Sequence, residues 1–272
     1  MSSSKKERID RLLVSRGLVE TRSKAQALLL AGKVFVGGSR VDKTGTQVPA
    51  DARIEVRDDG EKWVSRGAHK LLRGLDSFSV SPVDLVCVDI GASTGGFTQV
   101  LLERGARKVY AVDVGYGQLA WSLRNDERVV VMERTNARSL TPENFRELPD
   151  LAVADASFIS LKLLIPPIRL VLASEGQAIL LVKPQFEVGK GRVGKGGVVR
   201  AKDDHIAVLK DILSFCEENG DFHPAGLTFS PITGPMGNIE YLLHLVRTKG
   251  SGRTPSPEET VEEAHHFFRK EG

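Results

Sequence analysis

The chain has 272 residues, of which 41% are hydrophobic and 27% charged, an ordinary balance for a globular protein with a sizeable core. Its two cysteines are too few for a disulfide framework or a cysteine-based zinc site. The first ten residues are polar and lack the apolar core of a signal peptide, and no apolar run approaches the ~20 residues of a membrane-spanning helix. We therefore expect a cytoplasmic protein with no metal site.

The positive charge of the chain is concentrated at its N-terminus. Residues 1–60 contain twelve Lys and Arg against eight Asp and Glu, a net charge of +4, which leaves −1 for residues 61–272 of a chain whose total is +3. A basic unit in front of a nearly neutral one suggests a polyanionic partner.

The stretch "ERIDRLLVSRGLVETRSKAQALLLAGKVFVGG" predicts two short helices, ended by Gly17 and Gly32, followed by a strand at 34–36. It resembles the alpha-L RNA-binding motif shared by a small-subunit ribosomal protein, pseudouridine synthases and tyrosyl-tRNA synthetases. The resemblance implies that basic side chains of this unit contact RNA phosphates. A basic, solvated face on a small packing module is the alternative. The candidate RNA-binding residues are Arg16, Arg22, Lys24 and Lys33.

A short linker with an amphipathic helix follows at residues 61–81. Leu71, Leu72, Leu75 and Phe78 form the apolar side of this helix, and Lys70 lies among them. Periodicity alone makes Lys70 a surface lysine whose stem covers apolar neighbours.

Strand-like runs alternate with helical stretches from Leu85 onward, which predicts an α/β fold with a doubly wound parallel sheet. The connection between "GLTFS" and "IEYLLHLV" is too short for a crossover helix, so we expect these two strands to pair antiparallel. The result is a seven-stranded sheet with one reversed edge. We expect helices near 98–104, 117–124, 142–147, 161–173 and 201–218, the third of them starting at "TPE".

The segment "VDIGASTGGFTQVLL" is the first strand–turn–helix of this sheet. Its glycines allow the backbone to approach a ligand beside a helix N-terminus, and the next strand ends in Asp113, where an acid can bind a ribose diol. This is not the dinucleotide fingerprint G-x-G-x-x-G. A tight turn without a ligand is the alternative, but the glycines and the acid together favour a nucleoside cofactor.

The D-x-G-A-x-x-G-G-F-T pattern resembles motif I of class I S-adenosylmethionine methyltransferases. The resemblance implies S-adenosylmethionine as cofactor, with Asp113 at its ribose and Asn136 near its adenine. The candidate cofactor-binding residues are Asp89, Gly91, Ser93, Gly95, Gly96, Phe97, Asp113 and Asn136.

Three ionisable residues fall at strand tips on one edge of the predicted sheet. Asp155 ends the fourth strand, Lys183 ends the fifth, and Glu240 begins the antiparallel "IEYLLHLV". Ligands of open parallel sheets bind beyond the carboxyl ends of the strands, so these residues are expected to meet at the cofactor. A structural ion-pair network is the alternative.

Lys70, Asp155, Lys183 and Glu240 match in order the K-D-K-E tetrad of ribose 2′-O-methyltransferases related to FtsJ, and residues 5–247 as a whole resemble the TlyA family. The resemblance implies methylation of a ribose 2′-hydroxyl in ribosomal RNA, at a cytidine, with Lys183 as general base. "DASF" stands where base methyltransferases carry N-P-P-Y, which counts against that class. The glycine-rich loop after Lys183 is expected to contact RNA phosphates through Lys190, Arg192 and Lys195.

We therefore expect an RNA-binding domain at 1–60, a linker and helix at 61–81, a methyltransferase domain at 82–249 and a helical tail at 250–272. The expected partner is ribosomal RNA or a ribosomal subunit, with no membrane and no metal, and the sequence leaves the oligomeric state open. A non-catalytic ribosome-binding factor remains an alternative, as does a membrane-active haemolysin, although no amphipathic insertion segment stands out. Pseudouridine synthesis requires a different fold.

Overall fold

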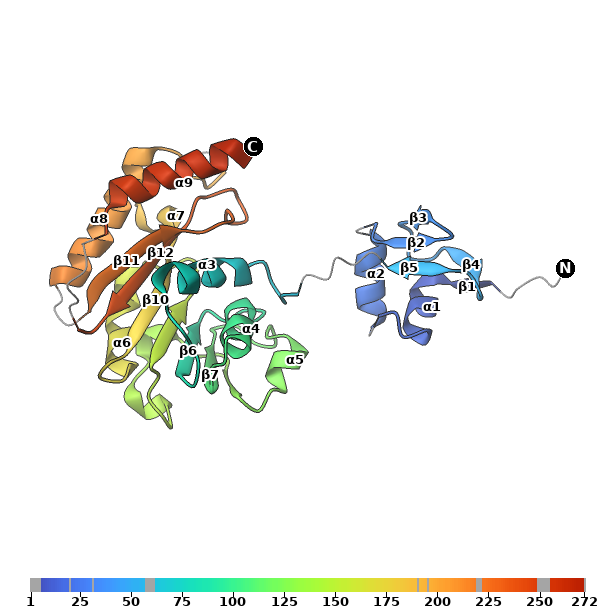
Figure 1. Ribbon diagram of the computed structural model, residues 1–272, viewed down its shortest axis with the longest axis horizontal. Coiled ribbons are helices and arrows are strands. Elements are labelled where there is room, and N and C mark those ends of the chain that lie inside the picture. The colour runs from blue at the N-terminus through green and yellow to red at the C-terminus, as the bar shows by residue number, and fades with distance from the viewer. Residues whose placement is uncertain are drawn as a thin grey trace. The chain divides into compact units, whose positions relative to one another are not determined.

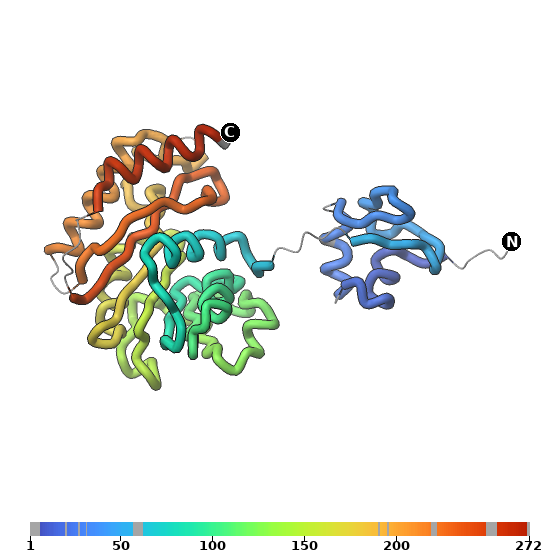
Figure 2. The backbone as a smooth tube through the Cα atoms, in the orientation of Figure 1, coloured from blue at the N-terminus to red at the C-terminus, as the bar shows by residue number. Residues whose placement is uncertain are grey.

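The structure is a computed structural model that describes residues 6–19, 21–30, 32–56, 62–189, 191–194, 196–218, 222–248 and 255–271. The chain divides into two compact units, Met1–Lys62 and Trp63–Gly272 (Figure 2).

The first unit packs two helices against small antiparallel sheets (Figure 1). Its core contains Ile9 and Leu13 from the first helix, Leu29 from the second and Val34 from the sheet, all fully buried. Both expected helices and the strand at 34–36 are confirmed. Gly17 and Gly32 follow the two helices with φ of +68°, a left-handed conformation that glycine adopts at no steric cost. The elements are β1 (Lys6–Arg8), α1 (Ile9–Ser15), α2 (Arg22–Leu30), β2 (Val34–Val36), β3 (Ser39–Val41), β4 (Gln47–Pro49) and β5 (Ile54–Val56).

The second unit is an α/β fold with a seven-stranded sheet in the order β11-β12-β10-β9-β6-β7-β8. Helices α3, α4 and α5 pack on one face of the sheet, and α6, α8 and α9 pack on the other. The strands are β6 (Val86–Ile90), β7 (Lys108–Val112), β8 (Val129–Met132), β9 (Leu151–Ala154), β10 (Gln177–Val182), β11 (His223–Phe229) and β12 (Tyr241–Val246). The helices are α3 (Ala68–Phe78), α4 (Gly96–Glu103), α5 (Trp121–Arg124), α6 (Ile165–Val171), α7 (Pro184–Glu187), α8 (Lys202–Glu218) and α9 (Pro257–Glu271).

The reversed strand of this sheet is β12, and it is not an edge strand as the sequence suggested. β12 pairs antiparallel with both β10 and β11, so the edge strand β11 runs parallel to the others. The crossover through α8 delivers β11 in the parallel direction, and the short return after it inserts β12 between β11 and β10. This insertion places the beginning of β12 beside the end of β10.

The expected helix at 142–147 is wrong, because only a 3₁₀ turn, η2 (Pro142–Asn144), forms there. Thr141 and Asn144 make a capping box at its start, as a helix would. Phe145 then adopts an extended backbone and packs edge-on against Tyr110, with ring centroids 4.9 Å apart. Burial of this ring outweighs local helix propensity. The short η1 (Ala137–Ser139) and η3 (Leu161–Leu163) are likewise 3₁₀ turns.

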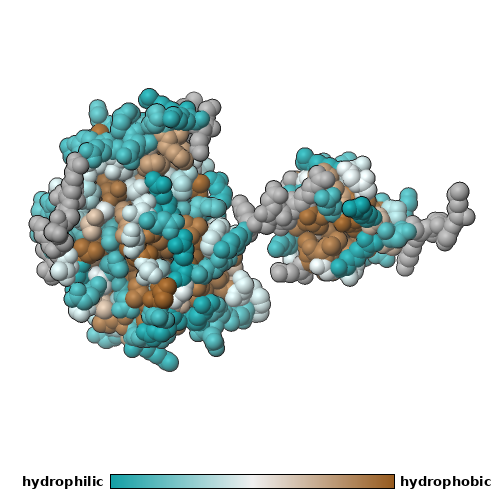
Figure 3. Space-filling view, in the orientation of Figure 1, coloured by the Kyte–Doolittle hydropathy of each residue, from teal (hydrophilic) through white to brown (hydrophobic). Residues whose placement is uncertain are grey.

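The C-terminal helix α9 packs against α8 and β11, and its Val261 and Ala264 are fully buried. Within the described parts of the chain, no helix is both long and apolar enough to cross a membrane. On the visible face of the α/β unit, hydrophobic residues are interspersed with hydrophilic ones (Figure 3).

Candidate active site

The strand tips bring three charged residues to one edge of the sheet, and a helix supplies a fourth. Asp155 directly follows β9, Lys183 directly follows β10, and Glu240 directly precedes the antiparallel β12. The register pairs Val182 with Tyr241, so Lys183 and Glu240 emerge side by side. Lys70 reaches the same place from the first turn of α3.

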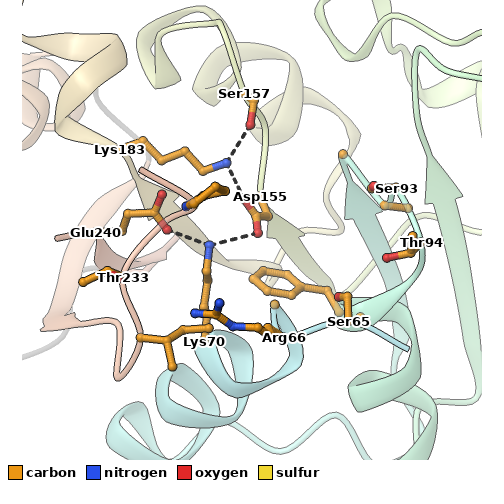
Figure 4. Close-up of a pocket in the computed structure, with 17 residues that line it drawn as sticks. Ser65, Arg66, Lys70, Ser93, Thr94, Asp155, Ser157, Lys183, Thr233 and Glu240 are labelled. Carbon is orange, nitrogen blue, oxygen red and sulfur yellow. Dashed lines mark hydrogen bonds and ion pairs between the residues drawn. The ribbon is translucent and has the colours of Figure 1, made fainter. Parts of the chain in front are cut away.

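These four side chains form an alternating chain of ion pairs (Figure 4). The Lys183 Nζ lies 2.5 Å from Asp155 Oδ1, and the Lys70 Nζ lies 3.5 Å from Asp155 Oδ2 and 2.6 Å from Glu240 Oε2. Lys70 and Lys183 are each 7% exposed and Glu240 is 1% exposed. Buried charges of this kind need opposite charges beside them, and here each ammonium has a carboxylate and each carboxylate an ammonium.

Lys70 is therefore not the surface lysine that periodicity alone suggested. The helix that carries it packs closely on the sheet, where a Cβ added at Gly74 would lie 3.1 Å from Ile179 Cγ2. This close approach places the Lys70 stem beside the strand tips and its ammonium between two carboxylates. Periodicity could not show this position, and only the resemblance to the K-D-K-E tetrad pointed to it.

Ser157 is a member of the site that the sequence reasoning missed. The Lys183 Nζ donates a hydrogen bond of 2.9 Å to Ser157 Oγ (Figure 4). Ser157 lies only two residues after Asp155 in the "DASF" segment. This closeness to the tip of β9 was the one sign in the sequence that Ser157 belongs to the site. Sequence alone does not show how the chain turns after Asp155.

Two adjoining cavities open at this edge of the sheet. The first, of about 380 Å³, is lined by the four charged residues together with the glycine turn after β6 and the loop at 232–235. The second, of about 510 Å³, lies over the ends of β6, β7 and β9. Gly91, Ser93, Asp155 and Ser157 line both cavities, so a molecule in the second can reach the charged residues of the first.

The second cavity fits a nucleoside. Asp113, at the tip of β7, accepts hydrogen bonds from the backbone N–H of Ser93 (2.8 Å) and Gly115 (2.7 Å), and each carboxylate oxygen keeps a further lone pair. Asn136 uses its Oδ1 to accept from the Arg138 N–H, which leaves its amide donors for a ligand. The cavity also has an apolar wall, formed by Val112, Val114, Ile159 and Leu164. A ribose diol and a flat base are the groups that such a lining suits.

Most of the candidate cofactor residues line the cavities, but Asp89 and Gly95 do not. Gly91, Ser93, Gly96 and Phe97 line the first cavity; Asp113 and Asn136 line the second. Gly95 has φ of +100°, and a Cβ there would lie 2.3 Å from Leu123 Cδ1. The turn therefore needs this glycine for its own packing.

Asp89 is fully buried beneath the glycine turn. Its Oδ2 accepts a 2.7 Å hydrogen bond from Thr98 Oγ1, whereas Oδ1 has no partner among the described residues. Burial raises the pKa of Asp89 to about 7, and the Thr98 hydrogen bond opposes this shift. Asp89 thus supports the glycine turn from beneath through Thr98 and does not line either cavity.

The candidate RNA-binding arginines make contacts inside the first unit. Arg16 donates to the backbone carbonyls of Ala50 and Ala52, and Arg22 donates to the buried Asp10 at 3.0 Å. The hydrogen bonds from Arg8, with those from Arg22, hold the pKa of Asp10 well below its usual range. Both arginines remain accessible, and Lys24 is exposed while Lys33 is half-buried.

In the glycine-rich loop, Arg192 lies 3.5 Å from Asp204, whereas Lys190 and Lys195 are outside the described residues.

The sheet order with β12 inserted, the glycine turn after β6 and the acid after β7 together define a class I S-adenosylmethionine-dependent methyltransferase. Residues 63–247 match the FtsJ-like methyltransferase family, and residues 7–54 match the S4 domain. The chain belongs to the FtsJ-like methyltransferase family, within the TlyA group that carries an S4 domain in front.

Three relatives illustrate the similarity. A candidate rRNA methyltransferase of Bacillus subtilis is 50% identical over 98% of this chain and 97% of its own. The 16S/23S rRNA (cytidine-2′-O)-methyltransferase TlyA of Mycobacterium tuberculosis is 49% identical over 89% of this chain and 90% of its own. The solved structure of a candidate hemolysin from Streptococcus thermophilus is 42% identical, covers 99% of both chains and superposes with a TM-score of 0.75.

Proposed function

We propose that the protein methylates the 2′-hydroxyl of a cytidine ribose in ribosomal RNA, with Lys183 as general base. The observation that carries the proposal is the alternating chain of Lys183, Asp155, Lys70 and Glu240, which lines a cavity beside a nucleoside-sized one. If the four residues served only to stabilise the fold, they would not need to line an open cavity, as they do here. The name of the Mycobacterium tuberculosis relative supports both the ribose hydroxyl and cytidine as targets.

The second cavity would hold S-adenosylmethionine, with Asp113 at the ribose diol and Asn136 at the adenine. When bound, this cofactor supplies a methyl group on a sulfonium, which an oxygen nucleophile can take. Asp155 and Ser157 line both cavities, so a cofactor held in the second would have its reactive end beside the charged residues of the first.

A ribose hydroxyl must lose its proton as its oxygen attacks a methyl group. Lys183, which pairs with Asp155 as an ammonium, would first release a proton to solvent and then accept the hydroxyl proton at its Nζ, while Asp155 and Ser157 fix its position from two sides. Once Lys183 carries the proton, two ammonium groups face two carboxylates and the charges of the cluster balance. The carboxylates thereby stabilise the positive charge that arrives on Lys183.

The other charged residues orient the reacting groups. The Lys70 Nζ contacts Glu240 and Asp155, which leaves one N–H to donate to the substrate hydroxyl. Glu240 holds the Lys70 ammonium in place, and Asp155 links the two lysines. Alignment of the hydroxyl with the methyl group supplies much of the acceleration in such a transfer.

The test is Lys183→Ala, assayed for transfer of labelled methyl groups to ribosomal RNA and for S-adenosylmethionine binding. We expect methyl transfer to fall by about 10²-fold or more, because the base is lost, while the cofactor affinity stays within about twofold. Lys210→Ala, at an exposed lysine of α8, serves as the matched control and retains activity. Near-native transfer by Lys183→Ala would refute the role of Lys183, and mapping the modified nucleotide tests ribose and cytidine.

A further inference from the structure

A second carboxylate joins the two segments that carry Asp155 and Lys183. Helix α7 begins directly after Lys183 and ends at Glu187. Ser160 Oγ donates to Glu187 Oε2 at 2.7 Å, and the Leu161 N–H donates to Glu187 Oε1 at 2.8 Å. We call these three residues the carboxylate latch.

The latch and the ion pair lie at opposite ends of the same two segments, 155–161 and 183–187. Lys183 contacts Asp155 and Ser157 at one end, and Glu187 contacts Ser160 and Leu161 at the other. Between them, the rings of Phe158 and Phe186 lie 5.1 Å apart. The two segments are thus fastened along their whole length.

The loop at 155–161 requires this fastening because it contains a strained residue. Phe158 has φ of +63°, the left-handed region that bulky side chains rarely adopt, and its side chain is 90% exposed. Such a conformation persists only where surrounding contacts impose it. An exposed ring contributes little burial, so the contacts on either side of Phe158 must hold the backbone.

Burying the Glu187 carboxylate costs free energy of desolvation, so packing alone does not explain its presence. Burial raises the pKa of its carboxyl, and the hydrogen bonds from Leu161 and Ser160 oppose that shift. The other nearby charges, Lys162 and Asp211, form an ion pair of 2.5 Å with each other. The carboxylate is therefore matched to the two donors of the loop rather than to a counter-charge.

We propose that Glu187 is a positioning residue, whose carboxylate holds the 155–161 loop so that Asp155 and Ser157 meet the Lys183 amine. This inference rests on the proposed function of the charged cluster. Glu187 touches neither cavity, and it acts only through the loop. Loss of the latch lets Phe158 relax toward negative φ, which displaces both partners of Lys183.

The test is a graded series of variants in the full-length protein. Ser160→Ala removes one of the two latch hydrogen bonds, together with the 3.2 Å bond that Ser160 Oγ accepts from the Lys162 N–H. We expect it to lower kcat for RNA methylation about threefold, and Glu187→Ala to lower it about thirtyfold. Glu187→Gln keeps an acceptor for the Leu161 N–H and should fall between them. KM for RNA should change by less than about twofold, because Glu187 lines neither cavity, whereas the affinity for S-adenosylmethionine can fall, because residues 155–159 of the loop line the second cavity. Glu263→Ala, at an exposed glutamate of α9, is the matched control.

Amide hydrogen exchange supplies a readout that does not depend on activity. Exchange at residues 157–163 should accelerate about tenfold or more in Glu187→Ala, with unchanged protection in α8. Wild-type kcat in Glu187→Ala, or a change confined to KM, overturns the inference while leaving the proposed function intact. If the wild-type protein transfers no methyl group to RNA, the proposed function fails, and the catalytic role of the latch fails with it. Ser160→Ala and Glu187→Gln keep the test decisive should Glu187→Ala not fold.

Discussion

At the scale of single residues, the site depends on lysines whose role is set by what surrounds them. Lys183 directly follows a buried strand, and its ammonium contacts Asp155 and Ser157 at the wall of the first cavity. Lys70 has an unremarkable place in an amphipathic helix, yet it lies between Asp155 and Glu240. The residue types matter less than the partners that the fold supplies.

Removal of one partner from the buried Lys70–Glu240 pair should destabilise the α/β unit. Lys70→Met leaves the Glu240 carboxylate without its nearest counter-charge, and we expect the free energy of unfolding to fall by about 3 kcal/mol. Lys70→Met combined with Glu240→Gln removes both charges and should recover much of that loss. Urea unfolding measures both variants, with tryptophan fluorescence reporting this unit because Trp63 and Trp121 both lie in it. If the double variant lost the sum of the two single-variant losses in the free energy of unfolding, Lys70 and Glu240 would not be energetically coupled.

Ser157 should matter for catalysis and little for stability. Ser157→Ala removes the hydrogen bond that the Lys183 amine makes at 2.9 Å, and we expect kcat to fall about tenfold. Cofactor affinity should change by less than about threefold, since Asp113 and Asn136 are untouched. Ser174→Ala, at an exposed serine between α6 and β10 that lines neither cavity, is the control. An unchanged kcat would show that Asp155 alone positions Lys183.

At the scale of elements, β6, the glycine turn and α4 act together around one buried carboxyl. Asp89 lies in β6, Thr98 in the first turn of α4, and the glycines join the two elements. The hydrogen bond from Thr98 to Asp89 fastens the helix to the strand beneath the turn. This hydrogen bond fixes the glycine turn between β6 and α4 on the side away from the cavities.

This arrangement predicts a pH-dependent stability. The pKa of Asp89 is raised to about 7 in the folded protein, against about 4 when unfolded. Between these values the native state binds a proton that the unfolded state releases, so the free energy of unfolding falls as the pH rises from about 4 to 7. Asp89→Asn keeps an acceptor for Thr98 and should flatten that decline. Urea unfolding of both proteins from pH 5 to 8 checks this, and parallel curves would contradict it.

The end of the glycine-rich loop is anchored by Asn238, two residues before Glu240, and by His205 of α8. Asn238 Oδ1 accepts from the Val199 N–H at 2.9 Å, and its Nδ2 donates to the Gly197 carbonyl at 2.9 Å. His205 is fully buried, and its Nε2 lies 3.0 Å from the Val199 carbonyl. The loop that follows Lys183 thus returns to the strand that Glu240 begins, which ties its end to the charged cluster.

At the scale of the whole molecule, the chain joins an S4 domain to a methyltransferase domain. The S4 unit has its own core and its own buried charge, Asp10, held by Arg8, Arg22 and Gln26. The α/β unit contains all the residues of the charged cluster and both cavities. Recognition and chemistry should therefore respond to different mutations.

Asp10→Ala should impair RNA recognition by the S4 unit and leave the chemistry of the α/β unit intact. It leaves Arg8 and Arg22 without their shared carboxylate, and we expect the melting temperature of the S4 unit to fall by about 5 °C or more. Since Asp10 has a lowered pKa, its contribution to stability is present above about pH 4 and is lost as the pH falls further. KM for ribosomal RNA should rise while cofactor binding is unchanged. A fall in kcat without a change in KM would contradict the division of roles.

The fold class and most of the site were accessible from the sequence for particular physical reasons. Uninterrupted apolar runs such as "AILLV" indicate strands buried on both faces, and Lys183 stands out because an ammonium ends such a run. Asp155 and Glu240 follow from the rule that ligands of parallel sheets bind at the strand ends. Lys70 was identified only by resemblance, since its partners are 85 and 170 residues away in the chain.

The alternation of strands and helices thus came from the sequence, because hydrophobic period, helix caps and connection length act between neighbours in the chain. Tertiary structure alone decided the rest. Burial of Phe145 overrode a helix start, the return of β12 placed it inside the sheet, and the turn after Asp155 brought Ser157 to Lys183. Each of these outcomes depends on contacts between distant segments, whose energies no local pattern records.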